Sequence, residues 1–395
     1  MNINEKLEKI ALRMPNILLP NETVDMTKFS VIAQDQFSAE KEYWDDVDKI
    51  VGDSPSTLHM MLPEARFPLT DEKLNSIYDT MKKYATDGTL REIGPGFIYV
   101  KRQVSSGIRK GLVALIDLEQ YDYNDNAKSM IRVTEKTVKE RLPIRAEIRS
   151  KATIDMPHVM LLVEDKENLL MNYLDSIAND NNKLYDFDLM KNGGNIKGYH
   201  INKDTEIDAV ADIFLKLKEN IKDNLMFAIG DGNHSLAAAK ICYEKDKSEN
   251  KRYALVEIVN IYDDAVSFFP IHRLLINVDK AEFKKELNIN NYNPPNLQVL
   301  QKDLDKYLEK HKETTLEYIH GKDECLKLEN DKNLAIIYDE FKKDDFFKDI
   351  IEHGTLCRKT FSIGRNIDKR YYLECSKIMW GRTALDGCSP VRARS

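Results

Sequence analysis

The chain has 395 residues, of which 42% are hydrophobic and 32% are charged, and its formal net charge is −7 with a pI of about 5.8. The length allows two or three domains, the apolar content excludes global disorder, and the acidic balance argues against a general nucleic-acid or membrane binder. The N-terminus shows no secretory signal, no stretch approaches the roughly 18 apolar residues of a membrane span, and the five cysteines form no CxxC pair. We therefore expect a reduced, cytoplasmic protein.

The first 120 residues predict short strands, two helices and a hairpin. Apolar runs alternate with turn residues near the N-terminus, and later segments repeat apolar positions at helical spacing or are rich in β-formers. The expected elements are strands and loops within 14–70, a helix within 38–52 with Ser38 as its N-cap and Gly52 at its end, a helix over 71–85, and a hairpin of strands 96–104 and 111–118 around Ser-Ser-Gly.

The rest of the chain alternates strands and helices irregularly. The expected elements are a strand over 158–165, a charged helical stretch over 166–222 broken by the glycine-rich loop KNGGNIKGYH, a strand over 224–230, a helix over 235–245, strands over 252–264 and 266–277, a helix over 297–312, and strands near 315–320 and 333–339. This pattern predicts a mixed α/β (α+β) protein. We divide it into an N-terminal portion (1–94), a core (95–275), a C-terminal portion (276–380) and a flexible tail (381–395).

The run Gly-Asp-Gly-Asn-His-Ser (230–235) joins an apolar strand to an alanine-rich helix. Gly230 and Gly232 lack a Cβ, so a ligand can approach the backbone closely there. The first N–H groups of a helix have no intrahelical partner and attract anions such as phosphate, and Ser235 is placed to cap the helix or to donate to a phosphate oxygen.

Asp231 would repel a phosphate unless it binds Mg²⁺ or orients an attacking hydroxyl, and His234 could neutralise charge or move a proton. The alternative is an ordinary strand–turn–helix in which Asp231 is a turn residue and Ser235 an N-cap. The run matches neither a Walker loop nor a dinucleotide-binding fingerprint.

A second cluster is the arginine-rich segment IRVTEKTVKERLPIRAEIR (131–149). Arg141, Arg145 and Arg149 would share one helical face if the helix survives Pro143, and arginine suits bidentate phosphate recognition. The alternative is a solvated basic helix balanced by its own glutamates. His158 is expected to be a packed or capping histidine.

Several blocks resemble the ParB/sulfiredoxin-like superfamily, and within it a bacterial and protist family catalogued as a domain of unknown function. GDGNHSLAAA (230–239) is similar to its Asp-Gly-x-His-x-x-x-x-Ala signature. The other similar blocks, in order, are STLHMMLPE (56–64), GFIYVKRQ (96–103), GLVALIDLEQYDY (111–123), the segment 131–149, MPHVMLLVED (156–165) and RYALVEIVNI (252–261). The chain departs from the family where Thr134 replaces a histidine before Glu135, and where Asn233 and Ser235 replace the histidine and arginine beside His234.

The resemblance implies a ParB/sulfiredoxin-like core with large insertions and a kinase that phosphorylates free L-serine with pyrophosphate, ADP or ATP. Its product, O-phosphoserine, would enter cysteine synthesis. The implied catalytic residues are Glu135 as base, with Asp231 and His234 at the phosphoryl group, and Asp231 as the Mg²⁺ ligand. The expected substrate- and phosphate-binding residues are Thr137, Arg141, Arg145, Gly230, Gly232, Asn233, Ser235, His272 and Arg273.

No adenine-binding pattern is visible, which favours pyrophosphate as the donor. Three other functions stay open: a nucleotide-binding switch or DNA-partitioning protein, a sulfiredoxin-like reductase using Cys242, and a noncatalytic nucleotide- or phosphate-binding sensor. The acidic chain shows no basic recognition helix, and Cys242 lies well inside the predicted helix, which disfavours the first two. The proposed site requires that Glu135 and the 230–235 turn, nearly a hundred residues apart, meet at one cavity.

Overall fold

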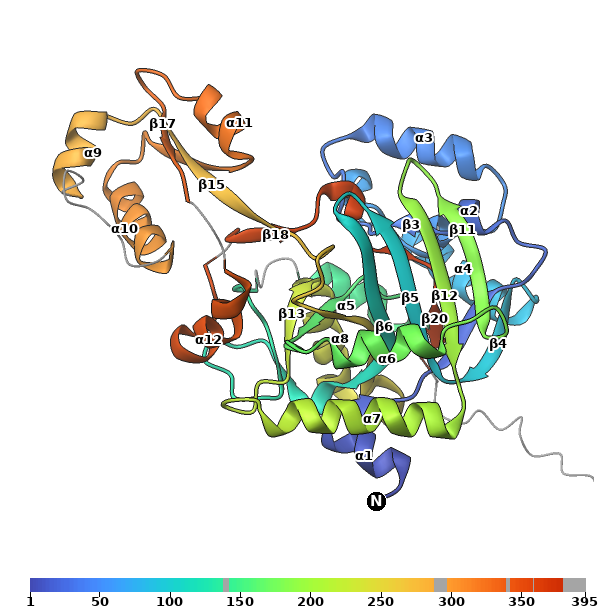
Figure 1. The fold of residues 1–395 in the computed structure, drawn as a ribbon. Coiled ribbons are helices and arrows are strands. Elements are labelled where there is room, and N and C mark those ends of the chain that lie inside the picture. Colours follow the sequence, from blue (N-terminus) through green and yellow to red (C-terminus); the bar gives the residue numbers. More distant parts are fainter. Residues whose placement is uncertain (138–141, 288–296, 339–341, 358, 379–395) are drawn as a thin grey trace, which may run out of the picture.

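A computed structural model describes residues 1–137, 142–287, 297–338, 342–357 and 359–378, and it confirms the mixed α/β class (Figure 1). The helices of these residues are α1 (Ile3–Lys9), α2 (Met26–Phe29), α3 (Lys41–Val51), α4 (Asp71–Thr86), α5 (Leu142–Ser150), α6 (Leu169–Ile177), α7 (Asp204–Glu219), α8 (Asn233–Asp246), α9 (Lys280–Glu286), α10 (Leu297–Lys310), α11 (Lys322–Lys327) and α12 (Lys343–His353).

The strands form one large sheet and several small ones. In chain order they are β1 (Leu12–Arg13), β2 (Asn16–Pro20), β3 (Val31–Ile32), β4 (Leu90–Pro95), β5 (Phe97–Val104), β6 (Gly107–Asp117), β7 (Tyr121–Asp122), β8 (Ile131–Arg132), β9 (Ile154–Asp155), β10 (Met160–Val163), β11 (Lys183–Leu189), β12 (Gly194–Ile201), β13 (Phe227–Asp231), β14 (Tyr253–Asn260), β15 (Phe268–Ile276), β16 (Thr315–His320), β17 (Leu334–Ile336), β18 (Phe361–Ile363), β19 (Tyr371–Tyr372) and β20 (Cys375–Lys377).

The main sheet is mixed, in the order β11-β12-β5-β6-β14-β10-β13-β8-β7, with β1 paired to β6. Both of its faces are covered. Phe97 and Tyr99 pack on one side with residues of α1, α6, α7 and α8, whereas Ile98 and Val100 pack on the other with α3 and α4. Successive side chains of a strand point to opposite faces, so the continuous apolar run of β5 is explained by burial on both sides.

The two ends of the described chain meet in a second sheet, ordered β4-β2-β20-β9, in which β2 pairs with β20. Near it, β19 pairs with β3. Residues close to the N-terminus and residues beyond 370 are therefore built into the same body. The division at 94 and 276 stays a proposal, and the predicted tail, 381–395, lies outside the described residues.

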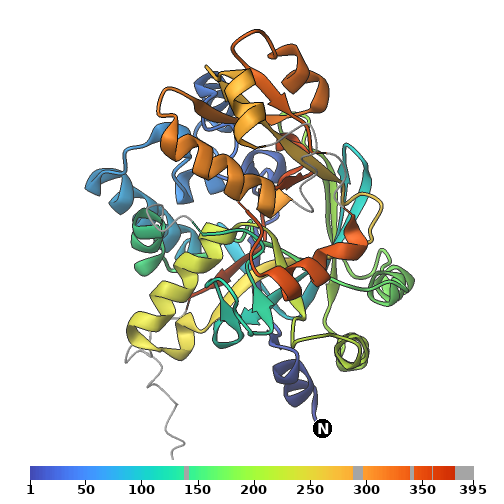
Figure 2. The ribbon, with the colours of Figure 1, turned by 90° about the vertical axis from the view of Figure 1, so that its left-hand side faces the viewer.

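A C-terminal lobe, formed by the end of β15 with β16, β17, α9 and α10, projects from the main body (Figures 1 and 2). The second half of β15 pairs with β16 and β17, while its first three residues pair with β18. α9 and α10 pack on this small sheet in a hydrophobic cluster of their own that includes Phe283, Leu304 and Tyr307. β15 thus belongs to both parts of the molecule.

Strand direction explains why distant segments meet. β8 and β13 are parallel neighbours, with Ile131 opposite Phe227, so the residues that follow both strands leave the sheet at the same edge. β10 is antiparallel to β13, with Met160 opposite Asp231, so its N-terminal end lies at that edge too. This edge carries the segments after residues 132 and 230 and the segment before residue 160.

Two local predictions are wrong. The stretch expected to be helical around KNGGNIKGYH contains the antiparallel hairpin β11–β12, because Lys191 and Asn192 adopt positive φ angles of 54° and 60° and turn the chain between alternating strands. α3 begins after Glu40 rather than Ser38, and no side chain caps it, although Gly52 ends it as expected. No helix of the described residues combines the length and apolar character needed to cross a membrane.

Candidate functional site

A cavity of about 440 Å³ opens at the sheet edge where β8 and β13 end. Many separate parts of the chain line it, among them the N-terminal loop around Asp35, the segment after β8 that includes Glu135, the turn 230–235, and the segment after α12 that includes Lys369. The two clusters that the sequence separates by nearly a hundred residues therefore share one cavity. Thr134 joins them directly, since its hydroxyl donates to the carbonyl of Ile229 at 2.7 Å.

The turn 230–235 delivers the N-terminus of α8 to this cavity. Gly232 is the N-cap, with φ of 87°, and a Cβ there would lie 2.9 Å from the Cα of Val159. The position therefore requires glycine for both conformation and space. Ser235 is not the N-cap that the sequence predicts, because the helix begins at Asn233 and places Ser235 inside the first turn. Gly230, Asn233, His234 and Ser235 all line the cavity.

Glu135 lies on the cavity wall opposite a turn of the C-terminal segment. Its Oε1 accepts a hydrogen bond from the backbone N–H of Thr360 at 3.1 Å. Burial raises the pKa of the Glu135 carboxyl, while the backbone N–H groups of Thr360 and Lys359 and the charge of Arg273 act in the opposite direction. The result is a carboxyl group that holds a proton more tightly than an exposed glutamate does.

Asp231, at the end of β13, is held on both carboxylate oxygens. Oδ1 accepts the N–H of Gly232 at 2.9 Å, and Oδ2 lies 3.1 Å from Nζ of Lys369. Lys369 was not identified from the sequence. Its side chain is only 10% exposed, so this ion pair is shielded from water.

The arginines do not form the open basic face that the sequence suggests. Arg145 lines the cavity but pairs with Glu64, and Arg149 makes a bidentate pair with Asp155 at 2.6 and 2.8 Å. Arg132 pairs with Asp223 at 2.9 Å, away from the cavity. α5 begins at Leu142, and Arg141 lies outside the described residues. Of the arginines in this set that the structure describes, only Arg145 lines the cavity.

Three histidines border the cavity: His158, His234 and His320. His158 is buried and bonds through Nδ1 to the hydroxyl of Tyr372 at 2.8 Å, which matches the packed role expected for it. Desolvation lowers the pKa of His320, and the positive charges of Lys359 and Lys369 act in the same direction. Basic groups from β16 and the C-terminal segment therefore converge here.

Three predicted ligand-binding residues do not line the cavity. His272 and Arg273 are buried in β15, where Nδ1 of His272 accepts the N–H of Tyr338 at 3.3 Å and Nε of Arg273 donates to Gln301 at 3.1 Å. The charge of Arg273 acts to lower the pKa of Glu135. Thr137 also lies outside the described lining.

The sequence did not reveal several lining residues, because no local pattern marks them. They come from loops and strand ends that the tertiary fold brings together, and they are Asp35, Glu64, His320, Lys359, Asn366 and Lys369. Asp35 is typical of them. Burial acts to raise its pKa, but the charges of His158, Arg145 and Lys369 and a hydrogen bond from Gln36 lower it overall.

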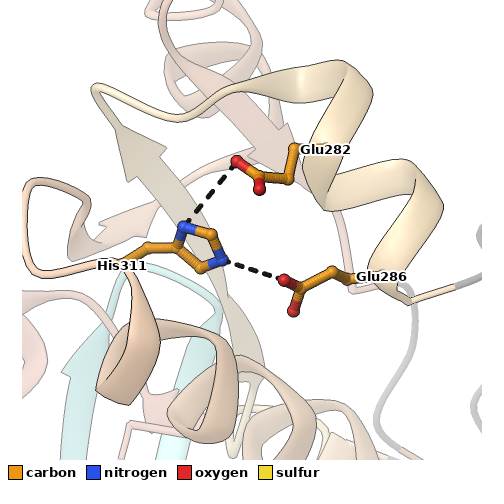
Figure 3. Close-up of side chains that lie close together, drawn as sticks. All are labelled: Glu282, Glu286 and His311. Atoms are coloured by element: carbon orange, nitrogen blue, oxygen red, sulfur yellow. Dashed lines mark hydrogen bonds and ion pairs between the residues drawn. The ribbon is translucent and has the colours of Figure 1, made fainter.

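Both carboxylate oxygens of Asp231 have protein partners, the N–H of Gly232 and the ammonium group of Lys369. Among the residues described, three metal-ligating side chains come together only at Glu282, Glu286 and His311 in the C-terminal lobe (Figure 3). There Nε2 of His311 lies 3.1 Å from Glu286 and Nδ1 lies 3.8 Å from Glu282. The bond to Glu286 raises the pKa of His311, so this group favours a protonated ring between carboxylates.

Residues 18–353 match the family described as "Protein of unknown function (DUF1015)". The chain belongs to the DUF1015 family. No curated protein matches it.

Solved structures similar to this DUF1015 protein include a free serine kinase variant in complex with AMP, with 12% identity and a TM-score of 0.37, and one in complex with ADP, with 11% identity and a TM-score of 0.38. Each similarity covers 67% of this chain and 92% of the other. A conserved hypothetical protein from Pyrococcus furiosus is similar at 13% identity and a TM-score of 0.34, over 67% of this chain and 95% of that one. None of these likenesses assigns a role to a residue of this chain.

Proposed function

We propose that this DUF1015 protein is a kinase that phosphorylates free L-serine to O-phospho-L-serine, with pyrophosphate as the favoured donor and ADP or ATP as alternatives. The proposal includes a ParB/sulfiredoxin-like core and rests on the sequence blocks that resemble that superfamily. One observation of the structure carries it. Glu135, a carboxyl group with a raised pKa, shares a cavity with the N-terminus of α8 and the ammonium group of Lys369.

These groups suit phosphoryl transfer, which needs a positioned nucleophile and charge stabilisation. In the proposed step the serine Oγ attacks the terminal phosphorus of the donor and the new O–P bond forms. The serine hydroxyl proton passes to the carboxylate of Glu135. The bridging P–O bond breaks, and inorganic phosphate leaves when pyrophosphate is the donor.

The cavity supplies positive charge from several directions. The N-terminal N–H groups of α8, Arg145, Lys359 and Lys369 stand around it, with His234 in the first turn of the helix. Five carboxylates line the same cavity, those of Asp35, Glu40, Glu64, Glu135 and Asp231, and two of them, Asp231 and Glu64, form ion pairs with Lys369 and Arg145. A phosphate donor that carries Mg²⁺ fits this mixture of cations and carboxylates.

Mg²⁺ is proposed to enter with the phosphates of the donor rather than to reside on the protein. Mg²⁺ commonly keeps waters and binds through one or two carboxylates plus substrate phosphates. When bound, it would neutralise phosphate charge. The part of Asp231 as its ligand stays a prediction.

The test is to incubate the purified protein with L-serine, MgCl₂ and either pyrophosphate, ADP or ATP, and to detect O-phosphoserine by mass spectrometry. We expect product with pyrophosphate, and D-serine and L-alanine serve as controls for the acceptor. If no donor gives product while pyrophosphate still binds by calorimetry, the kinase is excluded and a noncatalytic phosphate-binding regulator is the better description.

A further inference from the structure

The residues 359–378, here named the C-terminal strap, lie beyond the part of the chain that matches the family. They nevertheless form much of one wall of the cavity. The strap residues that line it are Lys359, Phe361, Ser362, Ile363, Asn366 and Lys369. In Figure 1 the strap begins at β18, beside the base of the C-terminal lobe.

Two buried arginines of the β5–β6 hairpin hold the strap by its backbone. Arg102 donates to the carbonyl of Lys369 at 2.5 Å and to that of Ile367 at 2.8 Å, and Arg109 donates to the carbonyl of Asp368 at 2.8 Å. Arg102 and Arg109 are 2% and 3% exposed. Hydrogen bonds from charged donors are strong where water is excluded, so the backbone around residue 369 is fixed in place.

The side chain of Asp368 adds a second anchor, to the turn of the same β5–β6 hairpin. Its Oδ1 accepts the N–H of Ser105 at 2.7 Å and the hydroxyl of Ser105 at 2.9 Å. The neighbouring Lys369 side chain lines the cavity, where its Nζ lies 3.1 Å from Oδ2 of Asp231. Several buried hydrogen bonds therefore hold one ammonium group at a cavity wall.

We propose that the strap completes the cavity as an anion-binding wall, with Lys369 as a phosphate-binding residue and Asp231 as the residue that positions it. This deepens the proposed function, on which it rests for the identity of the donor. The ligand class is a phosphoanhydride, such as pyrophosphate or the terminal phosphates of a nucleotide. An ammonium group provides a compact charge with three donors, which suits the oxygens of a phosphate.

The position of Asp231 is consistent with this role. Its carboxylate is held by the N–H of Gly232 and contacts the lysine at 3.1 Å, next to the first turn of α8. The helix N-terminus and the ammonium group therefore lie on the two sides of one carboxylate.

The test compares two lysines of the same strap. K369M removes the ammonium group at the cavity, whereas K377M removes that of Lys377, which is half-exposed and pairs with Glu92 outside the cavity. Pyrophosphate with MgCl₂ is titrated into each full-length protein by calorimetry. We expect the Kd of K369M to rise by about 10- to 100-fold, the usual effect of losing one charge-assisted hydrogen bond, and that of K377M to stay within about twofold.

The double variant D231N/K369M tests whether Asp231 acts through Lys369. D231N should weaken pyrophosphate binding when Lys369 is present and should not weaken it further in K369M, because the carboxylate acts through the lysine. Equal weakening in both backgrounds would remove Asp231 from this role. Thermal unfolding of each variant checks that the fold is retained, and K369R provides a folded variant that keeps the charge.

The outcomes separate this inference from the kinase. If K369M binds pyrophosphate like the wild type, Lys369 is not a phosphate-binding residue, whether or not serine is phosphorylated. If K369M loses pyrophosphate binding but the wild type makes no O-phosphoserine, the anion-binding wall stands and the kinase does not.

Discussion

Glu135 is the single residue on which the proposed chemistry depends most. It lies at the cavity, accepts a hydrogen bond from the N–H of Thr360, and has a raised pKa because it is buried. A carboxyl group with a raised pKa is a stronger base in its ionised form than an exposed glutamate, which favours transfer of the serine proton late in the reaction.

We expect E135Q to lower kcat by roughly 10²–10⁴-fold, the usual contribution of general acid–base catalysis. E147Q is the matched control, because Glu147 is an exposed residue of α5 outside the cavity. Initial rates of O-phosphoserine formation measure the effect, with pyrophosphate affinity measured separately. A rate for E135Q close to that of E147Q would exclude Glu135 as the base.

The same substitution should stabilise the protein at neutral pH. Because the folded state raises the pKa of Glu135, the folded state binds the proton more tightly than the unfolded state, and stability falls as pH rises through the interval between the two pKa values. E135Q lacks this titration. Its melting temperature should therefore exceed that of the wild type at pH 7, and the difference should shrink below about pH 4, near the ordinary pKa of glutamate. An equal difference at both pH values would show that ionisation of Glu135 is not the cause.

At the scale of elements, the start of α8 decides the geometry of the site. Gly232 has φ of 87° and no room for a Cβ, whereas Gly88 has nearly the same φ, 86°, and a Cβ added there would meet no atom within 4 Å. The two glycines thus differ in space but not in conformation. Alanine substitutions at the two positions therefore separate the free-energy cost of a left-handed backbone from that of a steric clash.

We expect G88A to destabilise the protein by roughly 1–2 kcal/mol, the conformational cost of a left-handed non-glycine residue. G232A should cost more, because its Cβ would press on the backbone of Val159, and it should also weaken pyrophosphate binding by shifting the α8 N-terminus. Urea denaturation of both variants measures the difference. Equal costs would mean that the loop of Val159 moves freely to admit the methyl group.

The sequence predicts some elements of the fold correctly and others not. The hairpin 96–104/111–118 and the strand–turn–helix around residue 230 follow from strong local patterns, and both are confirmed. The sequence predicts helix where β11 lies and a glycine-rich loop, KNGGNIKGYH, over the turn and most of β12. The break at residue 191 is therefore predicted, but the pairing of two strands on either side of Lys191 and Asn192 is not, because it depends on neighbours in the sheet.

The residues of the candidate site also differ in how well the sequence predicts them. Asp231 is identified from its local context and Glu135 from the family resemblance, and the parallel pairing of β8 and β13 brings them together. Lys369 lies in a charged run that matches no motif. Its position at the cavity depends on the hydrogen bonds that buried arginines donate to the strap backbone. His272 and Arg273 form a conspicuous pair in the sequence, yet burial in β15 keeps both out of the lining.

At the scale of the whole molecule, a buried ionic network ties the C-terminal strap to the centre of the main sheet. Arg370 pairs with Glu257 of β14 and with Glu374, and its Nε donates to the carbonyl of Pro157 at 3.0 Å. The carboxylates of Glu257 and Glu374 are at most 1% exposed. One arginine therefore forms ion pairs with two carboxylates that water cannot reach.

We expect R370M to destabilise the protein by about 3–5 kcal/mol, because it leaves buried carboxylates without their partner. R252M is the matched control. Arg252 makes two hydrogen bonds to Asp117, at 3.0 and 2.7 Å, but its side chain is 31% exposed, so water can replace the lost contact and the cost should be about 1 kcal/mol. Urea denaturation followed by circular dichroism compares them.

The pH dependence of R370M distinguishes an unpaired charge from a simple packing defect. Burial acts to raise the pKa of Glu257, but Arg370 and Arg109 lower it below its ordinary value, so the wild-type pair contributes stability above that ordinary pKa and loses it as pH falls. Without Arg370 the carboxyl group can take up a proton and enter the core neutral. The deficit of R370M relative to the wild type should therefore shrink between pH 7 and pH 4. A deficit that stays constant over this range would mean that Arg370 stabilises the strap by packing alone.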